Sequence, residues 1–453
     1  MDNQIEKNDE IEVTIERFGD NGEGIAVVDG KVLFVPFAVP GEVALVHIIN
    51  DKHSFLIGKI TQIIKGNNAK IVPKCPFFYK CGGCDLQHLP YKTQLELKKN
   101  IVRNALKKYA DIDFEVSDVI PSSKEFRYRN KFAFPVQDDN GKIKIGMYRK
   151  NSHDVIEIDD CLLQSENTKL ILKLFREYML ENKISAYSEK THKGIIKHIV
   201  VREHEGKFIL TVVVNDKKFN NFQPLIEKLK TQFSIFGIIK NVNLLQNNVI
   251  FGSFDEKIYG IDNLQFCDFD VEYEINNRSF LQVNDDIKNK IYQRVLDSLD
   301  EQNNIIDAYS GAGLLSSILA KKYKCVYGVE IESVATQNAD NLKNKNNLYN
   351  LTNINGDCAK VIPELAKQLK GDFAIVVDPP RKGLDGAVTE SFLTALPKQI
   401  IYISCNPATL ARDLKKLVTK YDIEFVQPYD MFPQTANVET VVGLRKNRKI
   451  REK

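Results

Sequence analysis

The chain has 453 residues, of which 43% are hydrophobic and 27% are charged, with 24 glycines and 15 prolines. This length predicts about three domains of ordinary size, and the composition excludes a disordered, collagen-like or fibrous protein. Lysine and arginine number 63 against 60 aspartates and glutamates, a formal net charge of +3. The overall charge therefore identifies no partner, and its distribution along the chain has to be considered instead.

No targeting or membrane signal is present in the sequence. Residues 1–10 are polar and acidic, unlike a secretory signal, and no apolar run approaches the roughly 18 residues that a spanning helix needs. We therefore expect a cytoplasmic protein without a membrane partner. Eight cysteines in such a chain are too sparse for a disulfide framework, so the close group Cys75, Cys81 and Cys84 indicates metal binding or catalysis.

The first 65 residues contain five short β-rich runs, broken by glycine and proline turns. The runs are Ile11–Ile15, Gly24–Val28, Val32–Pro36, Glu42–Ile49 and Leu56–Ile64. Five short strands at this spacing predict a small β-barrel. The spacing alone does not distinguish it from another small β-domain.

Positive charge is concentrated in two stretches. Residues 58–108 carry 11 basic against two acidic side chains (+9), and residues 121–150 carry eight against three (+5). The second stretch interleaves its charges with Phe126, Tyr128, Phe132, Phe134 and Tyr148. Aromatic side chains among cations suit stacking on unpaired bases. A β-meander with an aromatic core and solvated charges would give the same pattern, and both interpretations stay open.

Strand-like runs then predict a β-rich middle domain over residues 120–262. They are Lys142–Tyr148, Ile195–Val201 and Phe208–Val214. Before this domain, Leu95, Val102, Leu106 and Tyr109 recur at helical spacing, which predicts a helix.

From about residue 263 strands and helices alternate. The expected strands are Asn304–Asp307, Val326–Glu330, Phe373–Asp378, Ile400–Ser404, Ile423–Gln427 and Val438–Leu444, and the expected helices are Leu314–Lys322, Val334–Lys345 and Pro407–Thr419. This alternation predicts an α/β fold with a doubly wound, mainly parallel sheet. Ligands of such sheets bind at the carboxyl ends of the strands.

A nucleoside site is expected at these strand ends. The turn after the first strand contains Gly311 and Gly313, but residue 316 is serine where a dinucleotide fingerprint has glycine or alanine. Glu330, at the end of the next strand, is suited to ribose hydroxyls, and Asp357 to an adenine amino group. Nucleoside recognition without pyrophosphate contacts indicates S-adenosylmethionine.

Three further residues suggest chemistry. Asp378 ends a buried strand and is followed by two prolines, which make a rigid turn. Cys405 stands before Asn406 and Pro407, which suit the first positions of a helix, and a helix start lowers a thiol pKa. Glu439 interrupts an apolar strand, where burial would raise its pKa and suit it to act as a general base.

Taken together, these motifs resemble the S-adenosylmethionine-dependent uracil-5-methyltransferases of RNA, particularly the bacterial 23S ribosomal RNA branch. The resemblance covers essentially the whole chain and rests on Phe280–Asn284, Asp307–Gly313, Asp378–Gly383, Ser404–Pro407 and Glu439–Val441. It implies a Rossmann-like class I methyltransferase domain over residues 93–119 and 263–453. It also implies an oligonucleotide-binding-type TRAM barrel over residues 1–65 and a β-rich middle domain over 66–92 and 120–262.

The resemblance also implies ligands for two cofactors. Gln282, Tyr309, Glu330, Asp357 and Asp378 would line the S-adenosylmethionine pocket, and Cys75, Cys81, Cys84 and Cys161 would hold a [4Fe-4S] cluster. Spacing alone leaves zinc open, although the five residues between Cys75 and Cys81 exceed the two to four common at zinc sites. The cluster would organise the RNA-binding domain, or it would sense redox state.

The implied reaction methylates uridine C5 in 23S ribosomal RNA. Cys405 would add to C6, C5 would take the methyl group, and Glu439 would remove the C5 proton so that the thiolate leaves. The target base would lie outside regular helix. A transfer-RNA uracil methyltransferase is the nearest alternative. A non-catalytic RNA-binding or assembly factor would not need Cys405 and Glu439 together, and no obligate protein partner is expected.

Overall fold

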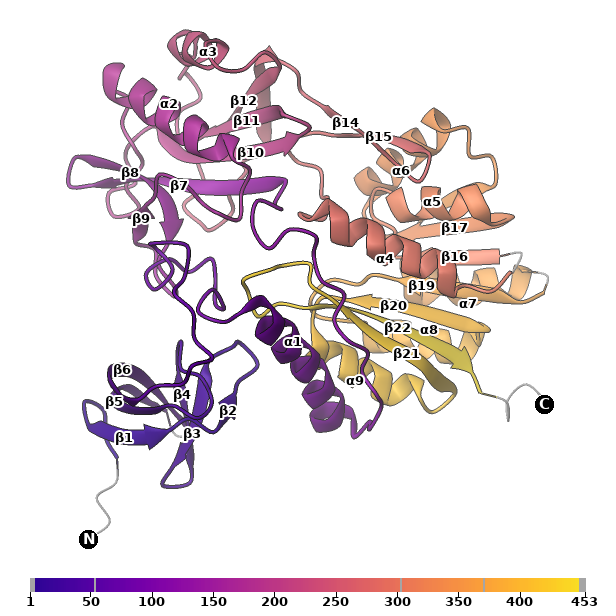
Figure 1. Ribbon diagram of the computed structural model, residues 1–453. Coiled ribbons are helices and arrows are strands. Elements are labelled where there is room, and N and C mark those ends of the chain that lie inside the picture. Colours follow the sequence, from indigo (N-terminus) through magenta and orange to yellow (C-terminus); the bar gives the residue numbers. More distant parts are fainter. Residues whose placement is uncertain (1–4, 53, 302–303, 370, 448–453) are drawn as a thin grey trace.

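The computed structural model describes residues 5–52, 54–301, 304–369 and 371–447. The chain forms an N-terminal β unit, a middle sheet with two helices, and a larger C-terminal α/β unit (Figure 1). A search of the described ranges found no helix with the length and apolarity needed to cross a membrane.

The N-terminal unit is a six-stranded sheet in the order β1-β5-β6-β4-β3-β2. Its strands are β1 (Glu10–Thr14), β2 (Arg17–Phe18), β3 (Gly24–Val28), β4 (Lys31–Val35), β5 (Val43–Lys52) and β6 (Phe55–Lys65). Alternate residues of these strands, such as Leu33, Val35, Val46 and Ile48, form the core. All five predicted runs are strands, and β2 is an additional strand too short to show an alternating pattern.

The middle unit is a seven-stranded sheet in the order β13-β12-β11-β10-β7-β8-β9. Its elements are β7 (Lys131–Asp139), β8 (Lys142–Tyr148), β9 (Val155–Glu157), α2 (Asn167–Glu181), β10 (Ile196–His204), β11 (Lys207–Val214), α3 (Gln223–Lys230), β12 (Phe236–Val242) and β13 (Phe254–Gly260). Helices α2 and α3 pack on one face. Tyr128, Phe132 and Phe134 are buried, so for these three aromatics the core interpretation is right and base stacking is wrong.

A helix joins the two β units to the C-terminal unit. Helix α1 (Tyr91–Ala105) continues into the π-helical segment η1 (Leu106–Ala110). Leu97, Ile101 and Val102 are buried in the same core as residues of α9 and β21. Tyr109, expected on the apolar face, is exposed and lies beside the Lys108 ammonium, because the π-helical turn shifts the helical register.

The C-terminal sheet has the order β18-β17-β16-β19-β20-β22-β21. Its strands are β16 (Asn304–Ala308), β17 (Cys325–Glu330), β18 (Leu351–Asn355), β19 (Phe373–Val377), β20 (Gln399–Ser404), β21 (Tyr421–Tyr429) and β22 (Glu439–Lys446). Strands β16 to β20 are parallel, and β22 is antiparallel to both of its neighbours. The hairpin β14 (Leu264–Asp268) and β15 (Val271–Ile275) precedes this sheet. The expected mainly parallel α/β sheet is confirmed.

Helices cover both faces of this sheet (Figure 1). Ile306, Ile375 and Ile400 point toward α1 and α7 to α9, whereas Ile305 and Ile401 point toward α4 and α5. The helices are α4 (Asp285–Ser298), α5 (Leu314–Lys322), α6 (Ser333–Lys345), α7 (Cys358–Gln368), α8 (Gly386–Ala395) and α9 (Pro407–Leu417). Because both faces are covered, a ligand reaches this sheet at the ends of its strands.

Candidate active site

Five neighbouring parallel strands deliver predicted residues to one edge of the sheet. Tyr309 follows β16, Glu330 ends β17, Asp357 follows β18, Asp378 follows β19 and Cys405 follows β20. Carboxyl ends of parallel strands lie at the same edge. The structure therefore brings these five residues to one side of the sheet.

The glycine turn is built around Glu330. Gly313 has a φ of +80°, and a Cβ there would lie 2.6 Å from the Ala339 Cβ, so glycine is required. The Glu330 carboxylate accepts from the backbone N–H groups of Gly311 (3.0 Å) and Glu332 (2.9 Å). Asp357 has a local role, since its carboxylate accepts from Ala359 N at 2.9 Å and caps α7.

Two carboxyl groups with strongly raised pKa values lie at this edge. Burial raises the pKa of Asp307 to about 7, although the hydrogen bond that its carboxylate accepts from the Ser316 hydroxyl lowers this pKa. Desolvation also raises the pKa of Asp378 to about 7. A cation bound beside these buried carboxyl groups would favour their ionised forms. The sequence analysis treated Asp307 only as part of a turn and missed its burial and raised pKa.

Cys405 and Glu439 face each other across two paired strands. Ser404 of β20 is opposite Thr440 of β22, so the next residues outward, Cys405 and Glu439, meet at the same edge. The Glu439 side chain is buried, and its Oε1 has no hydrogen-bond partner among the residues that the structure describes. A buried carboxylate oxygen without a partner is costly in a folded protein and points to a functional role.

The protonation of this pair differs in part from expectation. Asn406 caps α9, accepting from Ala408 N at 3.1 Å, as the sequence predicts. The pKa of the Cys405 thiol is nevertheless raised to about 11, chiefly by burial and further by Glu439 and Asp378, while Arg381 opposes the shift. The expected lowering by the helix start was wrong, because desolvation and two carboxylates outweigh it. Burial raises the pKa of Glu439 well above its ordinary value, as expected, and the nearby Asp378 raises it further.

The turn after Asp378 is fastened to the helix that follows Cys405. The Arg381 carbonyl accepts from Asn406 Nδ2 (3.1 Å) and Thr409 Oγ1 (3.2 Å). Arg412 donates to the carbonyls of Lys382 and Leu384 at 2.9 and 3.0 Å. These bonds hold Asp378 in a fixed position relative to Cys405.

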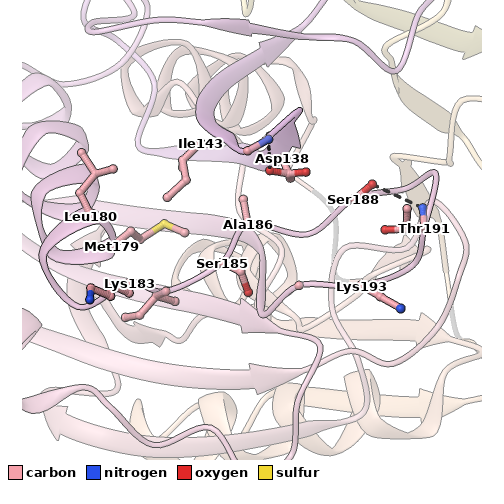
Figure 2. A pocket seen from close by; sticks show the side chains of 13 residues that line it. Asp138, Ile143, Met179, Leu180, Lys183, Ser185, Ala186, Ser188, Thr191 and Lys193 are labelled. Carbon is pink, nitrogen blue, oxygen red and sulfur yellow. Dashed lines mark hydrogen bonds between the residues drawn. The ribbon is translucent and has the colours of Figure 1, made fainter.

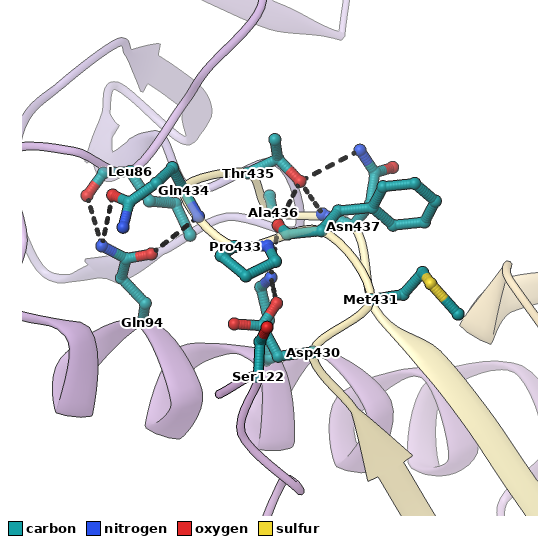
Figure 3. Close-up of polar contacts among 12 residues, drawn as sticks. Leu86, Gln94, Ser122, Asp430, Met431, Pro433, Gln434, Thr435, Ala436 and Asn437 are labelled. Atoms are coloured by element: carbon teal, nitrogen blue, oxygen red, sulfur yellow. Dashed lines mark hydrogen bonds and ion pairs between the residues drawn. The ribbon is translucent and has the colours of Figure 1, made fainter. Parts of the chain in front are cut away.

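Hydrogen bonds to its backbone hold the loop before Glu439, residues 430–438, and Figure 3 shows some of its polar contacts, such as those between Gln94 and Gln434. Four successive carbonyls accept from residues distant in sequence: Met431 from Asn284 Nδ2 (3.4 Å), Phe432 from Lys98 Nζ (3.0 Å), Pro433 from Tyr128 OH (3.1 Å), and Gln434 from Asp85 N and Leu86 N (3.0 Å each). The middle unit and α1 thus determine the position of Glu439, the first residue of β22.

Two buried polar side chains of α1 complete this network, and the sequence analysis missed both. Gln94 donates to the carbonyls of Leu86 and Leu89 and to Gln434 Oε1, and it accepts from Gln434 N, all within 3.0–3.1 Å. Lys98 forms a fully buried ion pair with Asp430. The only signal in the sequence was a polar side chain at a helix position that faces the core.

Gln282, the remaining predicted pocket residue, lies just before α4. Its carbonyl accepts from Asn130 Nδ2 at 3.0 Å, and its side chain is half-buried. Phe280, two residues earlier, is 82% exposed.

The four predicted cluster cysteines line one cavity of about 240 Å³. Cys81 Sγ accepts from Gly83 N and Cys84 Sγ from Gln87 Nε2, both at 3.3 Å. Burial raises the pKa of all four thiols, that of Cys161 to about 11. In the described ranges no three His, Cys, Asp or Glu side chains are arranged to hold a metal ion, so the predicted metal site is not shown.

A groove of about 510 Å³ lies elsewhere in the middle unit, where the β7–β8 turn meets the end of α2 (Figure 2). Asp138, Leu180, Lys183 and Lys193 are among its lining residues. It includes no predicted site residue, and its polar contacts are turn bonds such as Gly141 N to Asp138 Oδ1 at 3.0 Å.

Ion pairs neutralise part of the basic stretches. Of the first stretch, Lys70, Lys98, Lys99 and Lys107 pair with Glu42, Asp430, Asp118 and Asp111. Of the second, Arg127, Lys142, Lys144 and Lys150 pair with Asp160, Glu157, Asp139 and Asp85. The charge available to a polyanion is therefore smaller than the sequence sums indicate.

Comparison with known proteins agrees with this site. Residues 90–447 match the tRNA (Uracil-5-)-methyltransferase family and residues 4–61 match the TRAM domain. An uncharacterized RNA methyltransferase of Listeria innocua is 38% identical over 97% of this chain and 98% of its own length. One from Clostridium acetobutylicum is 37% identical over 98% of both.

Among solved structures, the Pyrococcus abyssi tRNA (uracil-54, C5)-methyltransferase in complex with S-adenosyl-L-homocysteine has a TM-score of 0.79 and 27% identity. The match covers 96% of this chain and all of that chain. The chain therefore belongs to the tRNA (uracil-5-)-methyltransferase family of S-adenosylmethionine-dependent RNA methyltransferases and carries an N-terminal TRAM domain.

Proposed function

We propose that this protein is a cytoplasmic enzyme that methylates C5 of uridine in 23S ribosomal RNA. The observation that carries the chemistry is the Cys405–Glu439 pair, placed by the register of β20 and β22 beside Asp378. Uracil C5 is a poor nucleophile, and a thiolate added at C6 activates it. A carboxylate on the same edge then removes the C5 proton.

Each residue of the pair has one task. The Cys405 thiol would lose its proton to solvent, and its thiolate would bond to C6, which places electron density on C5. S-adenosylmethionine, when bound, would supply the methyl group that C5 takes up, leaving as S-adenosylhomocysteine. Glu439 accepts the C5 proton, electrons return toward C6, and the Cys405–C6 bond breaks. A raised pKa suits Glu439 to this step because a base of ordinary pKa would hold the proton too weakly.

The cofactor pocket would lie along the strand ends from β18 to β19. Glu330 would bind the ribose hydroxyls and Asp357 the adenine amino group through the oxygen not used in the cap. Tyr309 and Gln282 would line the pocket, and Asp378 would face the sulfonium side.

The four-cysteine cavity would hold a [4Fe-4S] cluster with a structural role. Four thiols around about 240 Å³ are not gathered for a single ion, which binds sulfur at about 2.3 Å. Arg129 Nε and Gln164 Oε1, which line the same cavity, have no partner among the described residues. A cluster would supply sulfide acceptors for the Arg129 Nε–H donor and would account for soft ligands spread around a cage. Iron and sulfide analysis of anaerobically purified protein tests this, and stoichiometric zinc without iron would refute it.

Ribosomal rather than transfer RNA is proposed because the TRAM domain and the four cysteines accompany the methyltransferase domain, as in the branch that the sequence resembles. The test is methylation of protein-free 23S ribosomal RNA and of transfer RNA by the purified enzyme. Activity on transfer RNA alone would refute the proposal that 23S ribosomal RNA is the substrate.

The mechanism has a separate test. Cys405→Ala should bind S-adenosylmethionine but form no adduct and no product. Glu439→Gln should add and methylate but fail to eliminate, so that labelled methylated RNA stays attached to protein on a denaturing gel. Appreciable turnover by Cys405→Ala, with no RNA-linked protein from Glu439→Gln, would assign the chemistry to other residues.

A further inference from the structure

An uncharged loop with exposed apolar side chains joins β12 to β13 in the middle unit. Leu244, Leu245, Val249 and Phe254 are 47%, 53%, 54% and 56% exposed. No residue from 241 to 254 is charged, although 27% of the chain is. The tip consists of three amides, residues 246–248. We call residues 243–253, together with Phe254 at the start of β13, the β12–β13 loop.

Buried side chains fix the backbone of this loop. Asn243 is fully buried; its Nδ2 donates to the carbonyls of Val249 (2.6 Å) and Ile250 (2.9 Å), and its Oδ1 accepts from Leu245 N (2.9 Å). The Lys197 ammonium donates to the Leu245 carbonyl at 2.6 Å. These hydrogen bonds fix the backbone that carries Leu244 and Leu245, whose side chains are exposed to solvent.

The base of the loop is equally constrained. The buried Asn241 accepts from Gly252 N at 2.8 Å and donates to Gly252 O at 3.1 Å. A Cβ on Gly252 would lie 1.8 Å from the Val242 carbonyl oxygen, so only glycine fits. Two buried asparagines therefore hold both ends of the loop.

The β12–β13 loop adjoins the segment that carries Gln282. Arg278 donates to the Gly252 carbonyl, pairs with Asp255 and lies 5.7 Å from the Phe251 ring centroid. Lys131 lies over the same ring, also at 5.7 Å. Arg278 is two residues before the exposed Phe280 and four before Gln282, a predicted residue of the cofactor pocket.

We propose that the β12–β13 loop binds unpaired nucleotides that flank the target uridine. This inference rests on the proposed function. The apolar side chains would contact base faces, the three amides would read base edges, and the partly exposed Arg278 guanidinium would lie near a phosphate. RNA fits better than a second copy of the chain, because the amides at the tip and the guanidinium at the border match base edges and a phosphate.

The test compares two exposed leucines of the middle unit. Leu245→Asn alters the loop, and Leu180→Asn, on α2 and 59% exposed, is the matched control. With protein-free 23S ribosomal RNA and saturating S-adenosylmethionine, Leu245→Asn should raise the KM for RNA about fivefold with kcat unchanged, at the lower end of what loss of stacking on one base typically costs, because leucine has no ring. Leu180→Asn should match the wild type. Unchanged S-adenosylmethionine affinity and Tm show that both variants fold.

The outcomes separate this inference from the proposed function. If the wild type methylates 23S ribosomal RNA and both variants behave alike, the loop does not bind RNA. If Leu245→Asn only turns a dimer into a monomer, the loop is an interface between copies, and the inference is wrong. If the wild type methylates only transfer RNA, the proposed substrate fails, and the same pair of variants compared on transfer RNA decides the role of the loop.

Discussion

The Cys405 thiol of the free enzyme should be almost unreactive at neutral pH. Burial, with Glu439 and Asp378, raises its pKa to about 11. At pH 7.5 roughly one such thiol in 3,000 is ionised, against about one in ten for an ordinary cysteine, so alkylation should be on the order of 300-fold slower. The rate should then rise about tenfold per pH unit from pH 8 to 10, because only the thiolate reacts.

The chain supplies its own reference for this measurement. Cys267 is exposed, so iodoacetamide labelling of the two cysteines can be compared by peptide mass spectrometry in one sample. Arg381→Gln should slow labelling of Cys405 further, because the Arg381 charge lowers the thiol pKa. Labelling of Cys405 that levels off below pH 8 would mean that the helix start dominates after all, and the reasoning from burial would be refuted.

Three further results are expected. Lys98→Met leaves Asp430 charged and buried and should cost about 3–5 kcal/mol, seen as a lower Tm, whereas adding Asp430→Leu should restore most of it; no rescue would contradict a buried ion pair. Gly383 ends the turn that follows Asp378; it has a φ of +74°, and a Cβ there would lie 2.6 Å from the Asp413 Oδ2. Gly383→Ala should therefore displace this turn and weaken S-adenosylmethionine binding in calorimetry. Gly386→Ala should not, because the nearest atom to its Cβ would be Lys416 Nζ at 3.9 Å. Because the pKa of Asp307 is about 7, its ionisation between pH 6 and 8 should strengthen binding of cationic S-adenosylmethionine relative to S-adenosylhomocysteine, and equal pH profiles would argue against it.

Local pattern was sufficient for much of the fold. Gly24–Val28, Lys142–Tyr148 and Leu314–Lys322 have the predicted bounds, because each is a short periodic run between clear turn signals. Residues at the carboxyl ends of β16 to β20 could be predicted for the same reason: in a parallel sheet, position along the chain determines position at the edge. The helices α2 and α3 were missed because the middle domain was inferred from its strands alone.

Burial was the quantity that sequence could not supply. The aromatics of residues 121–150 alternate with charges whether they face solvent or core, and Phe134 is completely buried. Cys405 has the predicted place at a helix start, but its pKa is raised first by burial and then by Glu439, which lies 34 positions later in β22. Gln94 and Gln434 bond across 340 positions, a contact that no local pattern encodes.

The position of Glu439 explains why the methyltransferase unit packs against so much additional structure. The Oε1 atom of Glu439, the proposed general base, has no hydrogen-bond partner among the residues that the structure describes, so the position of this side chain depends on how its backbone is held. The loop before it provides this through Gln434, whose carbonyl accepts from Asp85 and Leu86. Asp85 directly follows Cys84 of the four-cysteine cavity. The segment that carries the cysteines and the loop before Glu439 are therefore parts of one hydrogen-bonded network, and a disturbance at the cavity has a short covalent and hydrogen-bonded route to Glu439.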